Sequence, residues 1–230
     1  MAKKIFIGVG HGGSDPGACN VKRREADDNL RLSLLVKDKL LAQGQRVKLS
    51  RETDTGMTPA QRRQMALDWR ADILVDIHRN SFTDPAAKGI EIWVRYNKYA
   101  ATAATVLEYL AAVPNQANRG VKIGNFAVLA DAGFSAMLLE LGFISNAIDN
   151  ELYDKYLDDN ATAVTRGILD VLGESYKVPG KTAPPASKPL YRVQVGAFSV
   201  RENAERFLQA VRDMGLAALL IRPEEAAMPE

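Results

Sequence analysis

The sequence contains very few of the residues that form disulfides or supply imidazole ligands: one cysteine and two histidines among 230 residues. The single cysteine, Cys19, cannot form a disulfide within the chain, which excludes a disulfide-stabilised scaffold. Any chemistry that needs an imidazole must use His11 or His78. These two residues are therefore the first candidates for a functional site.

An excess of one charge and long apolar segments are also lacking. The 30 basic and 28 acidic residues give a formal net charge of +2, which is too small to favour nucleic acid or an anionic membrane as the main partner. No apolar run approaches the roughly 18 residues of a membrane span, so no membrane insertion is expected. The apolar run at residues 5–9 is shorter than the core of a signal peptide, and we expect synthesis in the cytoplasm without a signal peptide.

The overall composition is that of a folded protein, with 47% hydrophobic and 25% charged residues, and it excludes a disordered chain. Residues 176–189 hold four of the ten prolines and show no apolar periodicity, so they are predicted to form an extended linker. This linker divides the chain into a domain at residues 1–175 and a short tail at residues 190–230.

Short β-branched runs alternate with longer helical patterns in the first domain. The alternation predicts an α/β fold with a mostly parallel sheet flanked by helices. The tail repeats the pattern once, as a βαβ half-module whose sheet edges would be open. In chain order, the predicted segments are residues 5–9, 29–43, 47–50, 59–69, 73–78, 89–95, 99–112, 126–129, 136–140 and 149–172, followed in the tail by 191–196, 201–214 and 217–221.

Four polar residues fall where open α/β sheets build their sites. His11 follows the first strand in a segment with five glycines between residues 8 and 17, and His78 and Glu140 each end a predicted strand. Glu25 lies at the mouth of the first helix, on the loop that leaves the same sheet edge. Because the carboxyl ends of parallel strands meet at one edge, these four side chains are expected to lie close together.

Two imidazoles and two carboxylates are the groups that a catalytic zinc site needs. Three of them can bind the metal, which leaves a position for water, and the fourth can take the proton of that water. A histidine at a strand end is also commonly a hydrogen-bonded structural residue, so placement alone leaves both interpretations open. Glu140 is a stronger candidate for a functional residue than the histidines, because an ionised side chain in an apolar strand needs a cation or a pocket.

Five sequence segments form a recognisable pattern. They are residues 7–18 (IGVGHGGSDPGA), 25–30 (EADDNL), 50–54 (SRETD) with Arg62 and Arg63, 71–80 (ADILVDIHRN) and 138–146 (LLELGFISN). In this order they resemble the zinc-dependent N-acetylmuramoyl-L-alanine amidases of the type-3 amidase family. The resemblance covers nearly all of residues 3–172, and the fold that it implies agrees with the alternation of strands and helices.

The resemblance implies a site and a reaction. His11, Glu25 and His78 match the three ligands of a zinc ion (Zn²⁺), and Glu140 matches the catalytic glutamate. The implied reaction is hydrolysis of the amide bond between N-acetylmuramic acid and L-alanine of the stem peptide, so the implied partner is bacterial peptidoglycan.

Two further residues are candidates for substrate binding. Asn80, two residues after His78, is expected to orient the substrate or to hold a loop by hydrogen bonds. Arg79 stands where the family more often has a small residue, and we expect it to place a positive charge at the rim of the site. Such a charge would affect which stem peptide is accepted.

The tail at residues 190–230 resembles the first half of a SPOR domain, a repeat that binds peptidoglycan glycan strands. Only one strand–helix–strand unit matches. Three outcomes are therefore open: the tail binds the wall, two tails pair in a homodimer, or the tail is vestigial.

Three interpretations of the whole chain remain at this stage. The first is a wall-lytic amidase that reaches its substrate when the membrane is breached, as an endolysin or a mother-cell autolysin does. The second is a catalytically silent peptidoglycan-binding or regulatory protein on the amidase fold, although all four key positions are filled. The third is a zinc peptidase that acts on a different amide.

Overall fold

A computed structural model describes residues 2–20, 23–178 and 198–214. The chain divides into two compact units, Met1–Lys181 and Thr182–Glu230, and each is described by itself. Most of the segment predicted as a linker lies outside the described residues.

The first unit is built on a six-stranded sheet with the order β4-β1-β5-β8-β6-β7. Four of its five strand pairings are parallel, and only β6 and β8 pair in the antiparallel direction. The predicted mostly parallel sheet is therefore confirmed, with β6 and β7 running opposite to the other four strands. The strands are β1 (Lys4–Val9), β4 (Arg46–Leu49), β5 (Ile73–Asn80), β6 (Ile90–Val94), β7 (Asn118–Ile123) and β8 (Ser135–Phe143).

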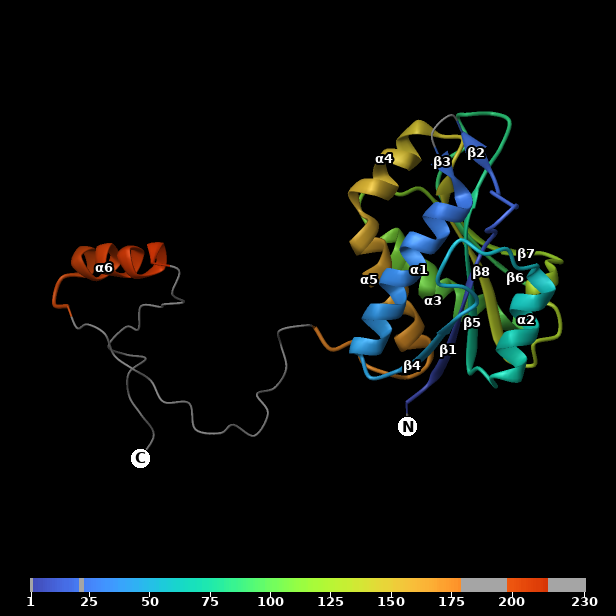
Figure 1. Cartoon of the computed structure of the whole chain (residues 1–230), viewed down its shortest axis with the longest axis horizontal. Coiled ribbons are helices and arrows are strands. Elements are labelled where there is room, and N and C mark those ends of the chain that lie inside the picture. Colours follow the sequence, from blue (N-terminus) through green and yellow to red (C-terminus); the bar gives the residue numbers. More distant parts are fainter. Residues whose placement is uncertain (1, 21–22, 179–197, 215–230) are drawn as a thin grey trace. The chain divides into compact units, whose positions relative to one another are not determined.

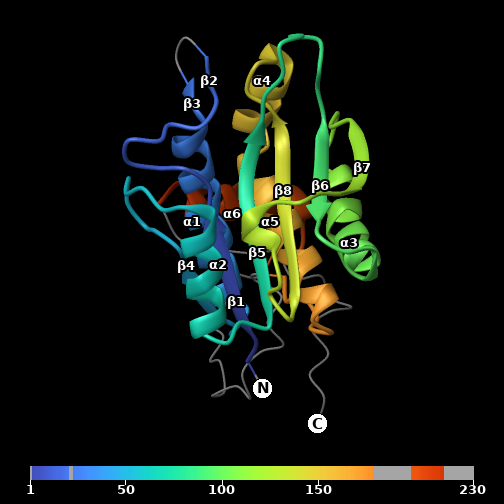
Figure 2. The ribbon, with the colours of Figure 1, turned by 90° about the vertical axis from the view of Figure 1, so that its right-hand side faces the viewer.

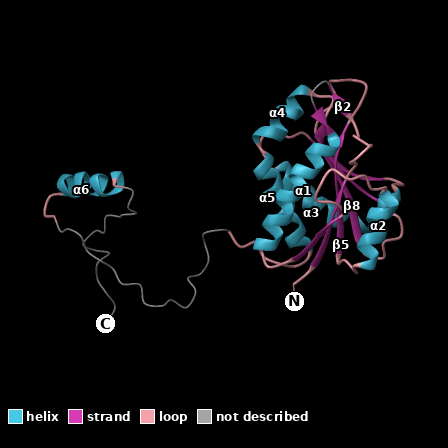
Figure 3. Ribbon diagram, viewed as in Figure 1, coloured by secondary structure: helices cyan, strands magenta, loops and turns pink. Residues whose placement is uncertain are grey.

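The two faces of the sheet are covered unequally (Figure 1; Figure 3). Helices α1 (Glu25–Ala42), α3 (Ala100–Ala111) and α5 (Leu157–Val171) pack on one face, where they enclose the larger apolar core. The other face carries α2 (Pro59–Asp68) and the short 3₁₀ helix η2 (Ala127–Leu129), with a smaller apolar cluster beneath them. In Figure 2, α2 lies toward the β4 and β1 side of that face.

The structure differs from the sequence prediction in four places. The first helix begins at Glu25 rather than residue 29, because three acidic residues in its first turn interact favourably with the positive end of the helix dipole. The predicted closing helix is two helices, α4 (Ala147–Lys155) and α5, which are separated at Tyr156. Residues 126–129 contribute to η2, and β7 was not predicted.

Several short elements complete the described chain. Strands β2 (Cys19–Asn20) and β3 (Arg23–Arg24) form an antiparallel pair, and η1 (Asn97–Tyr99) precedes α3. In the second unit, α6 (Arg201–Asp213) falls where the tail helix is predicted, whereas both predicted tail strands lie outside the described residues. Among the described residues, no helix is both long enough and apolar enough to cross a membrane.

Helix α2 begins with a complete capping box. The Thr58 hydroxyl accepts a hydrogen bond from the Gln61 backbone N–H at 3.2 Å, and the Gln61 side chain accepts one from the Thr58 backbone N–H at 2.8 Å. Pro59 occupies the first turn, where its missing N–H costs nothing. These residues set where α2 starts, and therefore where Arg62 reaches the sheet.

We predict that Thr58→Ala lowers the free energy of unfolding by about 1 kcal/mol, because it removes the side-chain acceptor of this cap. Chemical denaturation of the full chain measures the change. The matched control is Thr105→Ala in α3, where the hydroxyl donates only to the Ala101 carbonyl of its own helix; alanine there is expected to be neutral or slightly stabilising. Equal losses in the two variants would contradict the capping argument.

Candidate metal centre

The structure brings His11, Glu25 and His78 together. One ligand atom from each lies within 4.8 Å of the other two. Nε2 of His11 is 3.3 Å from one carboxylate oxygen of Glu25, and Nδ1 of His78 is 2.8 Å from the other. His11 follows β1, Glu25 is the first residue of α1 and His78 lies in the adjacent strand β5, so a single sheet edge assembles the group.

The remaining nitrogen of each imidazole contacts a second carboxylate. Nδ1 of His11 is 2.8 Å from Asp15, and Nε2 of His78 is 3.1 Å from Asp76. A carboxylate on the outer nitrogen fixes the ring orientation and makes the inner nitrogen a better ligand. Both histidines therefore have the arrangement expected of metal ligands.

Asp76 is itself held by a buried ion pair. Arg62 of α2 donates Nε and one terminal nitrogen to the two Asp76 oxygens, both at 2.9 Å. Both side chains are almost completely buried, at 3% exposure for Arg62 and 0% for Asp76. Gly8 of β1 and Gly10, which follows the strand, make room for this arrangement, because a Cβ on Gly8 would overlap the Asp76 carboxylate and one on Gly10 would overlap the His78 ring.

Glu25 is held in its ionised form. Burial alone would raise its pKa, but hydrogen bonds to His11 and His78 outweigh that effect and lower the pKa well below its usual range. The carboxylate also accepts hydrogen bonds from the Ala18 backbone N–H at 2.9 Å and the Arg79 backbone N–H at 3.1 Å. A negative ligand is thus fixed between the two imidazoles.

Arg51 connects the two loops that carry the first two ligands. One terminal nitrogen donates to the Gly10 carbonyl at 3.0 Å and to the Ala26 carbonyl at 2.8 Å. These residues flank His11 and Glu25, and Arg51 is only 4% exposed. The spacing of these two ligand segments is therefore set by a buried side chain from a third segment.

Glu140 lies on β8 directly beside His78 of β5, as its register partner. Burial, opposed only in part by the charge of His78, raises the pKa of Glu140 to about 8. Its Oε2 atom is buried and has no hydrogen-bond partner among the described residues. A carboxyl group in this state is available to a ligand that the fold itself does not supply.

The donor set fits a catalytic metal. Two imidazoles and one carboxylate are ligands that zinc accepts, and three protein ligands leave one position open for water or substrate. Glu140 stands beside this group, and its unpaired oxygen can receive a proton from a molecule in the open position.

Arg79 is not at the rim, so that prediction is wrong. Alternation along β5 turns it to the face opposite His78, where its side chain is fully buried. Its guanidinium donates to Asp28 at 2.6 Å and to Asn150 at 2.8 Å, and lies 4.2 Å from the ring centre of Tyr153. Only its backbone N–H reaches the candidate site.

Asn80 lies at the end of β5, where both ends of its amide have partners. Its nitrogen donates to Glu91 at 3.0 Å, and its oxygen accepts the backbone N–H of Ser81 at 2.7 Å. These bonds hold the loop after β5.

Sequence reasoning missed the residues that hold the two histidine ligands in place. Asp15 and Arg62 lie inside matched segments but were given no role, and Asp76 was overlooked. One signal was present: Asp76 is a charged residue in an apolar strand, two positions before His78 and so on the same face. Glu91, in the run Ile-Glu-Ile-Trp-Val, carries the same signal.

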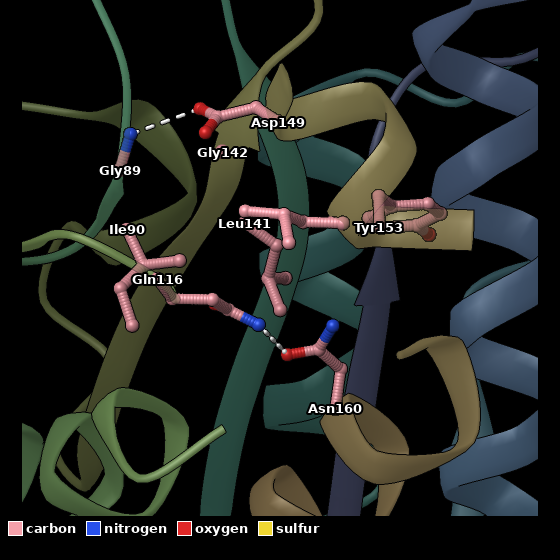
Figure 4. Close-up of a pocket in the computed structure, with 9 residues that line it drawn as sticks. Gly89, Ile90, Gln116, Leu141, Gly142, Asp149, Tyr153 and Asn160 are labelled. Carbon is pink, nitrogen blue, oxygen red and sulfur yellow. Dashed lines mark hydrogen bonds between the residues drawn. The ribbon is translucent and has the colours of Figure 1, made fainter. Parts of the chain in front are cut away.

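A small cavity lies on the face covered by α1, α3 and α5, away from the three candidate ligands (Figure 4). Its volume is about 10 Å³, which is space for about one water molecule. Asp149 accepts the Gly89 backbone N–H at 2.9 Å at its border, and Gln116 donates to Asn160 at 2.6 Å. Leu141 also lines it and follows Glu140 on β8, so its side chain points to the opposite face. The cavity is too small for a substrate.

Comparison with known sequences gives two matches. Residues 5–170 match the profile of the N-acetylmuramoyl-L-alanine amidase family, and residues 172–225 match that of the SPOR domain. The second match begins well before residue 190 and so includes the segment predicted as a linker.

Individual relatives agree with the first match. The chain is 32% identical over 226 residues to N-acetylmuramoyl-L-alanine amidase CwlM of Bacillus licheniformis, covering 95% of this chain and 84% of that protein. It is 31% identical over 224 residues to a sporulation-specific N-acetylmuramoyl-L-alanine amidase of Bacillus subtilis (strain 168), with the same coverage. The solved catalytic domain of CwlV, an amidase from Bacillus (Paenibacillus) polymyxa var. colistinus, superposes with a TM-score of 0.70 at 32% identity, covering 74% of this chain and 98% of that domain.

The Arg62–Asp76 pair generates a stability prediction. Asp76→Ala leaves the Arg62 guanidinium buried without its partner, and we expect it to lower the free energy of unfolding by about 3–5 kcal/mol. The double variant Arg62→Met with Asp76→Ala removes both charges and should recover much of that loss. Denaturant unfolding in the presence of a chelator measures both values without any contribution from bound metal. A double variant as unstable as Asp76→Ala would show that the loss does not come from the unpaired charge.

Proposed function

Because the chain belongs to the N-acetylmuramoyl-L-alanine amidase family, we propose that it is a zinc-dependent hydrolase of peptidoglycan that cuts the amide bond between N-acetylmuramic acid and L-alanine. The observation that supports this most directly is the group of His11, Glu25 and His78, with the unpaired oxygen of Glu140 one strand away. A catalytically silent protein would have no need to retain all four groups in this arrangement.

His11, Glu25 and His78 would hold the metal. When bound, zinc supplies Lewis acidity, which lowers the pKa of a water molecule to about 7 and polarises the scissile carbonyl. Asp15 and Asp76 keep the two imidazoles turned toward the metal position, and Arg62 keeps Asp76 in place.

Glu140 carries the proton transfer in this proposal. Its Oε2 takes a proton from the attacking water and later delivers it to the leaving nitrogen of L-alanine. Both histidines are assigned to the metal, so no spare imidazole is left for this role.

We assign the enzyme to wall lysis, as an autolysin of the mother cell or an endolysin. The sporulation-specific relative supports the autolysin setting. The SPOR match over residues 172–225 supports a second contact with peptidoglycan.

We predict that Glu140→Gln abolishes lysis of purified cell walls, because an amide cannot accept the proton. Zinc content should stay near one ion per chain, because Glu140 is not one of the three metal ligands. Wall turbidity and elemental analysis measure the two quantities. The matched control is Glu108→Gln on α3, an exposed glutamate on the opposite face, which should retain full activity.

The products distinguish this proposal from its rivals. An amidase releases new L-alanine amino termini and no new reducing sugars, which mass spectrometry detects. New amino termini at another residue would indicate a peptidase. A zinc-loaded wild-type chain that binds walls without cutting them would favour the silent wall-binding alternative, and lysis retained in Glu140→Gln would refute the assigned proton transfer.

The tail generates its own prediction. If residues after Lys181 bind the wall, the full chain should sediment with purified walls to a greater extent than a chain that ends at Lys181. If two tails instead pair in a homodimer, analytical ultracentrifugation should give twice the monomer mass for the full chain and the monomer mass for the shortened chain. Equal wall binding together with monomer mass in both chains would leave the tail without either role.

A further inference from the structure

We propose that Arg119 and Lys122 form a subsite for a carboxylate of the substrate, carried by the residue that follows L-alanine in the stem peptide. This inference rests on the proposed function and names a specificity element within the same site. It is carried by the position of an ion cluster next to Glu140, formed by the buried Glu91 of β6 and the partly exposed Arg119 and Lys122 of β7.

The cluster continues the row of site residues across the sheet. His78 of β5 is the register partner of Glu140 of β8, and Glu140 is in turn the register partner of Glu91 of β6. Figure 2 shows these strands side by side, with β7 beyond them at the edge of the sheet. Directly paired residues project on the same face, so Glu91 lies beside Glu140 on the face that holds the metal ligands.

Glu91 anchors the cluster. Its side chain is 2% exposed, and its oxygens accept hydrogen bonds from Arg119 at 2.7 Å and Lys122 at 2.5 Å. The indole of Trp93 and the amide of Asn80 donate to it as well, each at 3.0 Å. Burial alone would raise the pKa of Glu91, but the hydrogen bonds from Lys122 and Arg119 outweigh that effect and lower it.

The charges of the cluster do not cancel. Two cations face one carboxylate, which leaves a net charge of +1 at the position next to Glu140. Arg119 and Lys122 are about one-third exposed, at 36% and 33%, whereas Glu91 is buried beneath them. An ammonium group has three N–H donors and a guanidinium has five, so both side chains can bind an anion without releasing Glu91.

Aromatic packing preorganises Lys122. Its ammonium lies 5.2 Å from the centre of the Trp93 ring. Trp93 packs edge-on against Phe126, with their ring centres 5.3 Å apart. A cation that is already held in place loses less conformational entropy when an anion arrives, which increases its contribution to binding.

The reach of the stem peptide matches this position. In the proposed reaction Glu140 delivers a proton to the leaving nitrogen of L-alanine, which would place the peptide side of the scissile bond near Glu140. Adjacent strands are about 4.8 Å apart, and one extended residue spans roughly 3.5 Å. A stem peptide that runs from Glu140 toward β6 would bring the residue after L-alanine level with that strand, where Arg119 and Lys122 both donate to Glu91.

The test uses two synthetic muropeptides that differ at one group, a free α-carboxylate or its amide on the residue after L-alanine. We expect the wild-type chain to cut the carboxylate form with a kcat/KM about tenfold higher. Lys122→Gln and Arg119→Gln should each lower kcat/KM for that form several-fold, through KM, and leave the amide form nearly unchanged. The matched control is Lys48→Gln, an exposed lysine on β4 at the opposite edge of the sheet, which should change neither value.

A binding measurement separates the subsite from the reaction. Calorimetry in the Glu140→Gln background gives dissociation constants without turnover, and adding Lys122→Gln should weaken only the carboxylate form. Thermal unfolding and zinc content show whether each variant remains folded and loaded. Equal wild-type kcat/KM for the two forms, or equal losses on both in folded variants, would overturn the subsite. Carboxylate binding that depends on Lys122 in a wild-type chain that cuts neither form would support the subsite and contradict the proposed reaction.

Discussion

The buried carboxylate of Glu25, held between two imidazoles, is the interaction on which the candidate site depends. Glu25 begins α1, so its position couples the start of that helix to the ends of β1 and β5. A buried carboxylate without partners is costly, and here two histidines and two backbone N–H groups compensate for it. The same contacts that stabilise the loop after β1 therefore assemble the three metal ligands.

Alternation along the central strands separates this polar arrangement from the apolar core. On β5, Asp76 and His78 face the side covered by α2, whereas Val75 and Ile77 enter the core beneath α1 and α5. Arg79 follows the same rule and turns inward, where Asp28 and Asn150 satisfy it. Because α2 and η2 cover only part of their face, charged side chains from several neighbouring strands can meet there beside the ligands.

Much of the fold and of the candidate site could be predicted from sequence. Apolar runs with the period of strands and helices indicated the sheet, and the carboxyl ends of those strands indicated which residues would meet. Other elements gave too weak a signal. Strand β7 contains a glycine and lies at the sheet edge with little burial, so it lacks the apolar pattern that identifies a strand. The break between α4 and α5 at Tyr156 interrupts what looks like one continuous helical pattern.

By itself the sequence determined the class of fold, the family and four candidate residues, because these depend on local pattern and on residue type. Only the tertiary structure decided which charges pair. Asp76 pairs with Arg62, fourteen positions earlier in the chain. Glu91 pairs with Arg119 and Lys122 of the next strand in the sheet. The Arg79 side chain points away from the site and pairs with Asp28 on α1. Such pairings follow from strand order and side-chain direction, which become defined only when the sheet is assembled.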